Sequence, residues 1–98
     1  MSERIQRIQK AIEQKEKCRA THVHSTPVIE KHEGETVWGG VVETFDLDGH
    51  TTAKRAYAWE RHKDERGDAE YTVVLGLPPV NSPNDAVKAA IMATWKNL

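Results

Sequence analysis

The chain has 98 residues, with 14 Lys and Arg against 15 Asp and Glu and a formal net charge of −1. This balance argues against a generic binder of polyanions, which carries a clear excess of positive charge. Since 38% of the residues are hydrophobic and 30% are charged, the chain is too apolar for a disordered protein. Its length suits one domain rather than two, so we expect residues 1–98 to form a single domain.

Cys18 is the only cysteine, which excludes an internal disulfide and favours a reducing compartment. We therefore expect a cytoplasmic protein. The longest uncharged stretch, residues 71–84, contains three prolines and several polar residues. Such a stretch does not form a transmembrane helix, and the amphipathic N-terminal segment contains Glu3, Glu13 and Glu16, which do not fit a signal peptide, so we expect no membrane partner.

The N-terminal segment predicts an amphipathic helix over about residues 3–18. Apolar residues recur there at spacings of three and four, as in Ile5, Ile8 and Ile12. Ser2 stands just before this pattern and is a suitable N-cap, because its side-chain oxygen can accept an unsatisfied backbone N–H.

The middle of the chain predicts four strands. From residue 20 onward Val, Thr, Tyr and Trp become frequent, and three turn-forming segments interrupt them. The strands are predicted at residues 21–32, 36–46, 51–62 and 69–76. Short connections favour antiparallel neighbours, so the sheet should be a meander. Pro27 lacks a backbone donor and should lie at a sheet edge or a bulge.

A second helix is predicted over residues 83–96. Ser82 can act as its N-cap, Pro83 suits the first turn, and Asp85 occupies the acidic position of a capping box. The predicted fold class is therefore α+β, a two-layer sandwich in the order α-β-β-β-β-α, with an antiparallel meander sheet and both helices on one face. The predicted core consists of Ile5, Ile8, Ile12, Val41, Phe45, Val73, Leu75, Val87, Ile91 and Trp95.

The third predicted strand carries a candidate ligand-binding row. Because side chains alternate along a strand, one face should present Arg55, Tyr57, Trp59 and Arg61. Aromatic rings flanked by guanidinium groups could bind single-stranded nucleic acid or a small anionic ligand. The alternative is that the rings belong to the core and the arginines extend to the surface at the strand ends. Trp38, on the second strand, could join either face.

Histidines near the first strand form a candidate zinc site. His22 and His24 are two residues apart and should share a face of a strand, and Cys18 precedes them by four residues. The alternative is that these are surface histidines on an edge strand. Cys18 itself follows a helix, whose C-terminal dipole disfavours the thiolate and argues against a catalytic nucleophile.

No stretch of the sequence combines a nucleophile with a base. Gly39-Gly40 lies inside a predicted strand, where it indicates a bulge or close packing of a helix rather than a phosphate loop. We therefore expect a non-catalytic binding or protein-interaction module without a cofactor, whose partner is another protein or a second copy of the chain. The alternatives are the nucleic-acid or anion binder described above and a small enzyme or zinc protein with a histidine-based site.

The run from Glu35 to His50, continued by Ala53 to Trp59, resembles small bacterial proteins of about this length that form a domain of unknown function. The resemblance also includes Pro78-Pro79-Val80 and the segment from Ala86 to Ile91. It implies a bacterial cytoplasmic protein and implies no activity, ligand or role for any residue.

Overall fold

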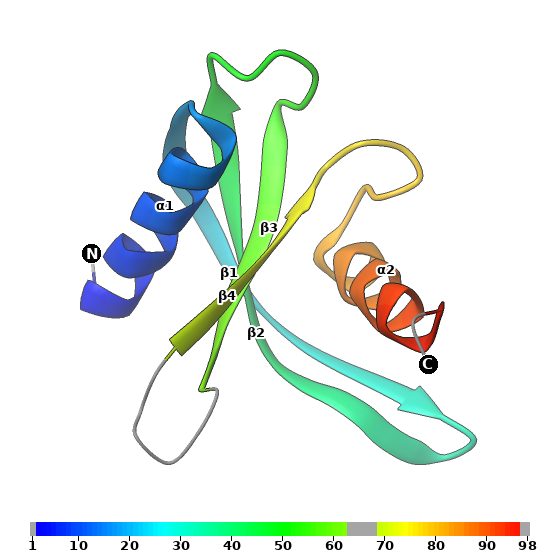
Figure 1. The fold of residues 1–98 in the computed structure, drawn as a ribbon. Coiled ribbons are helices and arrows are strands. Elements are labelled where there is room, and N and C mark those ends of the chain that lie inside the picture. Colours follow the sequence, from blue (N-terminus) through cyan, green and yellow to red (C-terminus); the bar gives the residue numbers. More distant parts are fainter. Residues whose placement is uncertain (1, 63–68, 97–98) are drawn as a thin grey trace.

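The computed structural model describes residues 2–62 and 69–96. Its helices and strands follow the predicted order, which confirms the α+β class (Figure 1). Two helices enclose a run of four strands: α1 (Glu3–Glu16), β1 (Arg19–His32), β2 (Glu35–Asp48), β3 (Arg55–His62), β4 (Ala69–Leu75) and α2 (Pro83–Lys96).

The four strands form one sheet in the order β1-β2-β3-β4, with antiparallel neighbours throughout. The predicted meander is therefore confirmed. β3 begins at Arg55 rather than at residue 51, because the preceding residues fold around His50. The His50 Nδ1 accepts hydrogen bonds from the backbone N–H groups of Thr52, at 3.1 Å, and Ala53, at 2.9 Å. Backbone groups used in this loop are not available to a strand.

Both predicted helix starts are confirmed. The Ser2 Oγ accepts a hydrogen bond from the backbone N–H of Ile5 at 3.2 Å, as an N-cap does. The Ser82 Oγ accepts one from the N–H of Asp85 at 3.2 Å, and the Asp85 carboxylate accepts one from the N–H of Asn81 at 3.1 Å. The two serine bonds satisfy donors that the first turn of a helix leaves without a partner, and the Asp85 bond satisfies the N–H of a residue just before α2.

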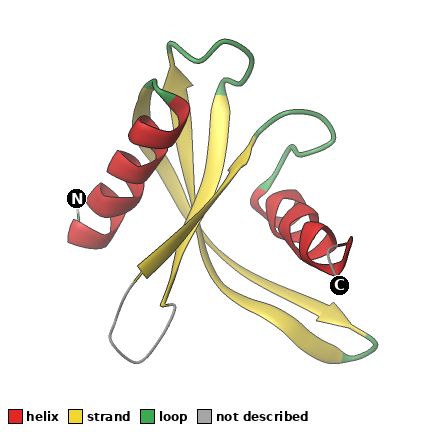
Figure 2. Cartoon of the chain, in the orientation of Figure 1, coloured by secondary structure: helices red, strands yellow, loops and turns green. Residues whose placement is uncertain are grey.

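The two helices cover opposite faces of the sheet, so the predicted placement of both on one face is corrected (Figure 2). On β3, Ala58 packs in the cluster beneath α1, whereas Tyr57 and Trp59 pack in the cluster beneath α2. Neighbouring residues of a strand point to opposite faces, so the domain has three layers rather than two. The sequence pattern hid this because the α1-facing residues of β3 are small alanines.

The predicted core is largely correct, with one clear exception. Val41 is 41% exposed, and its neighbour Val42 is fully buried instead. Val42 packs in the cluster beneath α2, so its neighbour Val41 points to the opposite face of the sheet. Of the other predicted core residues, Ile8, Ile12, Phe45 and Val87 are buried, Ile5, Val73, Leu75 and Ile91 are partly buried, and the side chain of Trp95 lies outside the described residues.

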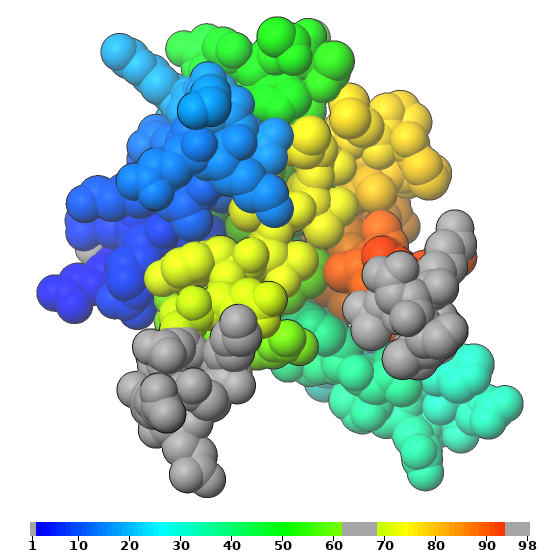
Figure 3. All heavy atoms as spheres, in the orientation of Figure 1, coloured from blue at the N-terminus to red at the C-terminus, as the bar shows by residue number. Residues whose placement is uncertain are grey.

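The pairing of β1 with β2 contains a bulge at Val23, since His22 pairs with Phe45 and His24 pairs with Thr44. A bulge inserts one residue and reverses which face the following residues take. Beyond it β1 continues as an outer strand, which confirms the edge position predicted for Pro27. Figure 3 shows the end of the β1–β2 hairpin projecting from the rest of the molecule.

Candidate functional site

The structure separates the predicted row on β3 into exposed ends and a buried centre. Arg55 donates to Asp46 at 3.1 and 3.2 Å, and Arg61 donates to Glu70 at 3.0 Å, and all four side chains are solvent-accessible. Tyr57 and Trp59 are 3% and 5% exposed and face α2. Their ring faces are therefore not open for a base to stack on. This arrangement matches the core alternative, and ligand binding by these four residues stays a prediction.

The spacing that suggested a zinc site does not bring its residues together. The bulge at Val23 places His22 on the face covered by α1 and His24 on the opposite face, because their partners Phe45 and Thr44 are consecutive on β2. Within residues 2–62 and 69–96, no group of three His, Cys, Asp or Glu side chains could hold a metal ion. Partial burial, followed by the charges of Glu16, Glu13 and Asp48, raises the pKa of Cys18, which disfavours its thiolate.

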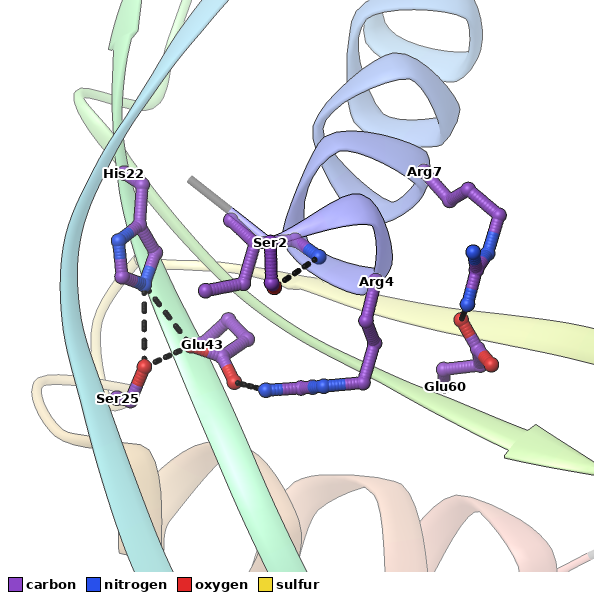
Figure 4. Close-up of polar contacts among 8 residues, drawn as sticks. Ser2, Arg4, Arg7, His22, Ser25, Glu43 and Glu60 are labelled. Atoms are coloured by element: carbon purple, nitrogen blue, oxygen red, sulfur yellow. Dashed lines mark hydrogen bonds and ion pairs between the residues drawn. The ribbon is translucent and has the colours of Figure 1, made fainter.

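A buried carboxylate links α1 to the sheet, and the sequence reasoning did not single it out (Figure 4). Glu43, on β2, has a fully buried side chain that contacts Arg4 of α1 at 2.6 Å and His22 Nε2 of β1 at 2.8 Å. The Ser25 hydroxyl also donates to it. Burial by itself would raise the pKa of Glu43, but the hydrogen bonds from Ser25, Arg4 and His22 outweigh it and hold that pKa below its ordinary value.

Ser, His and Glu meet here without forming a catalytic relay. The Ser25 Oγ and the Glu43 carboxylate both contact the same ring nitrogen of His22, at 3.3 and 2.8 Å. A relay needs the nucleophile at one ring nitrogen and the orienting carboxylate at the other. The cluster therefore satisfies a buried charge and holds the first turn of α1 against the sheet. Arg7 of α1 adds a second link, at 3.5 Å, to Glu60 of β3, whose side chain is 7% exposed. The signal for the cluster in the sequence was Glu43 itself, an acidic residue in the middle of a predicted strand, directly after two valines.

The opposite face of the sheet carries an apolar cavity that we call the tryptophan groove. It lies between α2 and the sheet and has a volume of about 560 Å³, within the range typical of ligand sites. Among the described residues that line it none is charged, and Thr72 contributes the one hydroxyl. The lining residues are Trp38, Trp59, Thr72, Val73, Val74, Leu75, Ala89, Ala90, Ile91 and Ala93.

A second hollow, which we call the strand notch, adjoins the groove. It measures about 300 Å³ and lies between β2 and β3, lined by residues 37–41 and 59–61. Trp38 and Trp59 line both cavities. The indole of Trp38 lies over Gly40, where an added Cβ would stand 3.1 Å from the ring. Gly40 thus allows close packing of a tryptophan from its own strand rather than of a helix, and the bulge in this region lies at Val37.

The groove itself could not be derived from the sequence. Trp38 could have joined either face of the sheet, and in the structure it packs against the cluster beneath α2, on the same face as Val42. The groove also needs small residues on α2, such as Ala89 and Ala93, which have no distinctive pattern in a helical sequence. The pair Gly39-Gly40 beside a tryptophan was the one local signal.

Comparison of the chain with protein-family models, with curated proteins and with solved structures finds no match. Among the described residues no helix has both the length and the apolar character needed to cross a membrane.

Proposed function

We propose that this protein is a non-catalytic interaction module that binds an apolar segment of a partner protein in the tryptophan groove. One observation carries the proposal: an apolar groove of about 560 Å³ runs between a helix and a sheet, with two tryptophans at its sheet side. Tryptophan is among the residues that contribute most to binding energy at protein interfaces. An apolar lining favours apolar side chains, because burying a charge there without a partner is costly.

The chemistry of the lining supports binding rather than catalysis. A catalytic site needs a nucleophile and a base within hydrogen-bond reach. The described lining of the groove provides the Thr72 hydroxyl and no base beside it. The Ser25, His22 and Glu43 cluster lies on the other face of the sheet and has the wrong geometry for a relay.

Nucleic acid is less well supported as the partner. Binding a single strand combines stacking with a basic groove that follows the backbone. No Lys or Arg lies among the described groove residues, and Arg55 and Arg61 of β3 are already paired with carboxylates.

The test is a selection from a phage-displayed library of random peptides, followed by affinity measurement with the most enriched peptide in synthetic form. Ala93→Phe should fill the groove from the exposed side of α2 and weaken binding at least about tenfold, or about 1.4 kcal/mol. Gln14→Phe is the matched control, because it adds the same side chain at an exposed position of α1. The control should bind as the unsubstituted protein does.

Three results would overturn the proposal. One is that no peptide is enriched over a library panned without the protein. The other is that the enriched peptide binds Ala93→Phe as tightly as Gln14→Phe. The third is that sedimentation shows the free protein to be a dimer and Ala93→Phe to be a monomer. This result would mean that a second copy of the chain occupies the groove.

A further inference from the structure

The ladder between β2 and β3 ends part-way along both strands. Its pairs run from Asp46 with Arg55 to Glu43 with Ala58. The next pairs in the same register, which would include Val41 with Glu60, are not formed, although β2 continues to Glu35 and β3 to His62. Figure 1 shows the β1–β2 and β3–β4 hairpins diverging beyond this point.

The register identifies the backbone groups that face the resulting gap. The backbone N–H of Leu47 donates to Lys54 O at 2.8 Å, so Leu47 directs its main chain toward β3. In an antiparallel ladder every second residue points to the same neighbour. Gly39 and Val41 therefore direct their N–H and C=O groups into the space between β2 and β3, where the ladder does not extend.

The strand notch, about 300 Å³ in volume, occupies this same space between the two strands. The face of β2 is also uncovered at Gly39, where an added Cβ would meet no atom within 4 Å. On the α2 side the notch leads to Trp38 and Trp59, and through them to the tryptophan groove.

The outer edge of the sheet is less suitable for a new strand. Val42 and Gly40 direct their backbone N–H and C=O groups to β1. The backbone groups of their partners Thr26 and Val28 therefore point toward β2, and the backbone of Pro27, between them, points away from the sheet. Proline has no N–H to donate, and its presence at an edge is a common protection against strand addition. The free edge of β2 has no such protection over Gly39 to Val41.

We propose that the partner segment binds as an extended strand along the free edge of β2, with its main chain bonded to Gly39 and Val41 in the strand notch. Strand addition of this kind draws affinity from main-chain hydrogen bonds and specificity from pockets that receive alternate side chains. Every second side chain of the segment points toward Trp38 and Trp59, and one of them enters the tryptophan groove. The partner is thus an extended segment with apolar residues at alternate positions. This inference rests on the proposed function and specifies its mode of recognition.

A matched pair of substitutions at Gly39 tests strand addition. Gly39→Pro removes the N–H that faces the gap and leaves the bonds between β1 and β2 intact, since Gly39 does not direct its backbone to β1. Gly39→Ala adds a methyl group on the face of the strand, where it meets no atom within 4 Å, and keeps the N–H that faces the gap. With the most enriched synthetic peptide as probe, we expect Gly39→Pro to weaken binding about tenfold and Gly39→Ala to change it less than about twofold.

Hydrogen exchange gives a readout that does not depend on a substitution. The amides of Gly39 and Val41 should exchange rapidly in the free protein and become protected in the complex with the same peptide. If Gly39→Pro does not fold, the peptide is instead N-methylated at alternate residues in two complementary sets. One set should abolish binding and the other should retain it, because a strand has two edges and only one pairs with β2.

The outcomes separate this inference from the proposed function. If Ala93→Phe blocks the peptide but Gly39→Pro binds it normally and the Gly39 and Val41 amides stay unprotected, strand addition is wrong and groove binding stands. Equal binding by both N-methylated sets would also contradict strand addition. If no peptide is enriched at all, both proposals fail together.

Discussion

Trp38 of β2 and Trp59 of β3 lie edge to face, with ring centroids 5.3 Å apart and ring planes at 68°. They meet beyond the last backbone pair between these two strands, Glu43 with Ala58. An aromatic contact therefore joins the hairpins where the hydrogen-bonded ladder does not, and its geometry is one that aromatic pairs prefer. The same two rings line both the tryptophan groove and the strand notch.

Trp59→Ala should be severely destabilising. The side chain is 5% exposed and packs with Tyr57 in the cluster beneath α2. Truncating a buried aromatic residue removes its packing and leaves a cavity, so we expect a loss of about 3–5 kcal/mol in the free energy of unfolding. Urea denaturation measures it. A loss below about 1 kcal/mol would mean that Trp59 is not a core residue.

Gly40→Ala and Gly39→Ala should differ, although the residues are adjacent. A Cβ at Gly40 would stand 3.1 Å from the Trp38 indole, whereas one at Gly39 would meet nothing within 4 Å. We expect Gly40→Ala to displace the indole, shift the tryptophan emission and lower the free energy of unfolding by about 1 kcal/mol. Gly39→Ala should leave both quantities nearly unchanged. Equal effects of the two substitutions would contradict the packing of Trp38 over Gly40.

Glu43→Gln should lower stability in a pH-dependent way. The folded-state pKa of Glu43 lies below its ordinary value, so its charge stabilises the fold above the unfolded pKa of about 4.3, and this contribution is lost as the pH falls through the folded pKa. At neutral pH we expect a loss of about 2 kcal/mol, because hydrogen bonds to a charged group are strong. In acid the difference from the unsubstituted protein should shrink.

Glu3→Gln is the control for this experiment, since Glu3 is exposed in the first turn of α1. This variant should be nearly as stable as the unsubstituted protein at both acid and neutral pH. Thermal unfolding of the three proteins across an acid-to-neutral series supplies the comparison. A pH-independent loss in Glu43→Gln would show that the carboxylate charge is not what stabilises the cluster.

His50→Ala should loosen the connection between β2 and β3. The ring accepts two backbone N–H groups through Nδ1 and contacts Glu16 of α1 through Nε2 at 3.1 Å. Removing it leaves these groups without partners, and we expect a loss of about 1–3 kcal/mol in chemical denaturation. His24→Ala, at an exposed position, should lose less than about 0.5 kcal/mol. Similar losses for the two variants would contradict this role.

The elements could be predicted from the sequence because each has strong local signals. Ser2 and Ser82 cap the helices as expected, and the turn segments separate four strands in the expected order. The faces could not be predicted as well. A single inserted residue, Val23, exchanges the two faces to which the following side chains of β1 point, and nothing in the local sequence marks it. The paired histidines are therefore on opposite faces.

The candidate site is harder to predict from the sequence than the helices and strands are. A groove between α2 and the sheet depends on which face each strand presents and on the separation of two layers, both set by tertiary packing. Alternation on β3 correctly placed Tyr57 and Trp59 together, but it could not show that α2 covers them. Glu43 was missed for the same reason, since its partners come from two other elements, Arg4 from α1 and His22 and Ser25 from β1.

The most direct test of peptide binding in the tryptophan groove is an NMR titration of the labelled protein with the selected peptide. The indole N–H signals of Trp38 and Trp59 should shift, together with the backbone amides of Ala89 and Ala93 on α2. Shifts confined to exposed α1 positions such as Gln14, with the two indoles unmoved, would contradict the account.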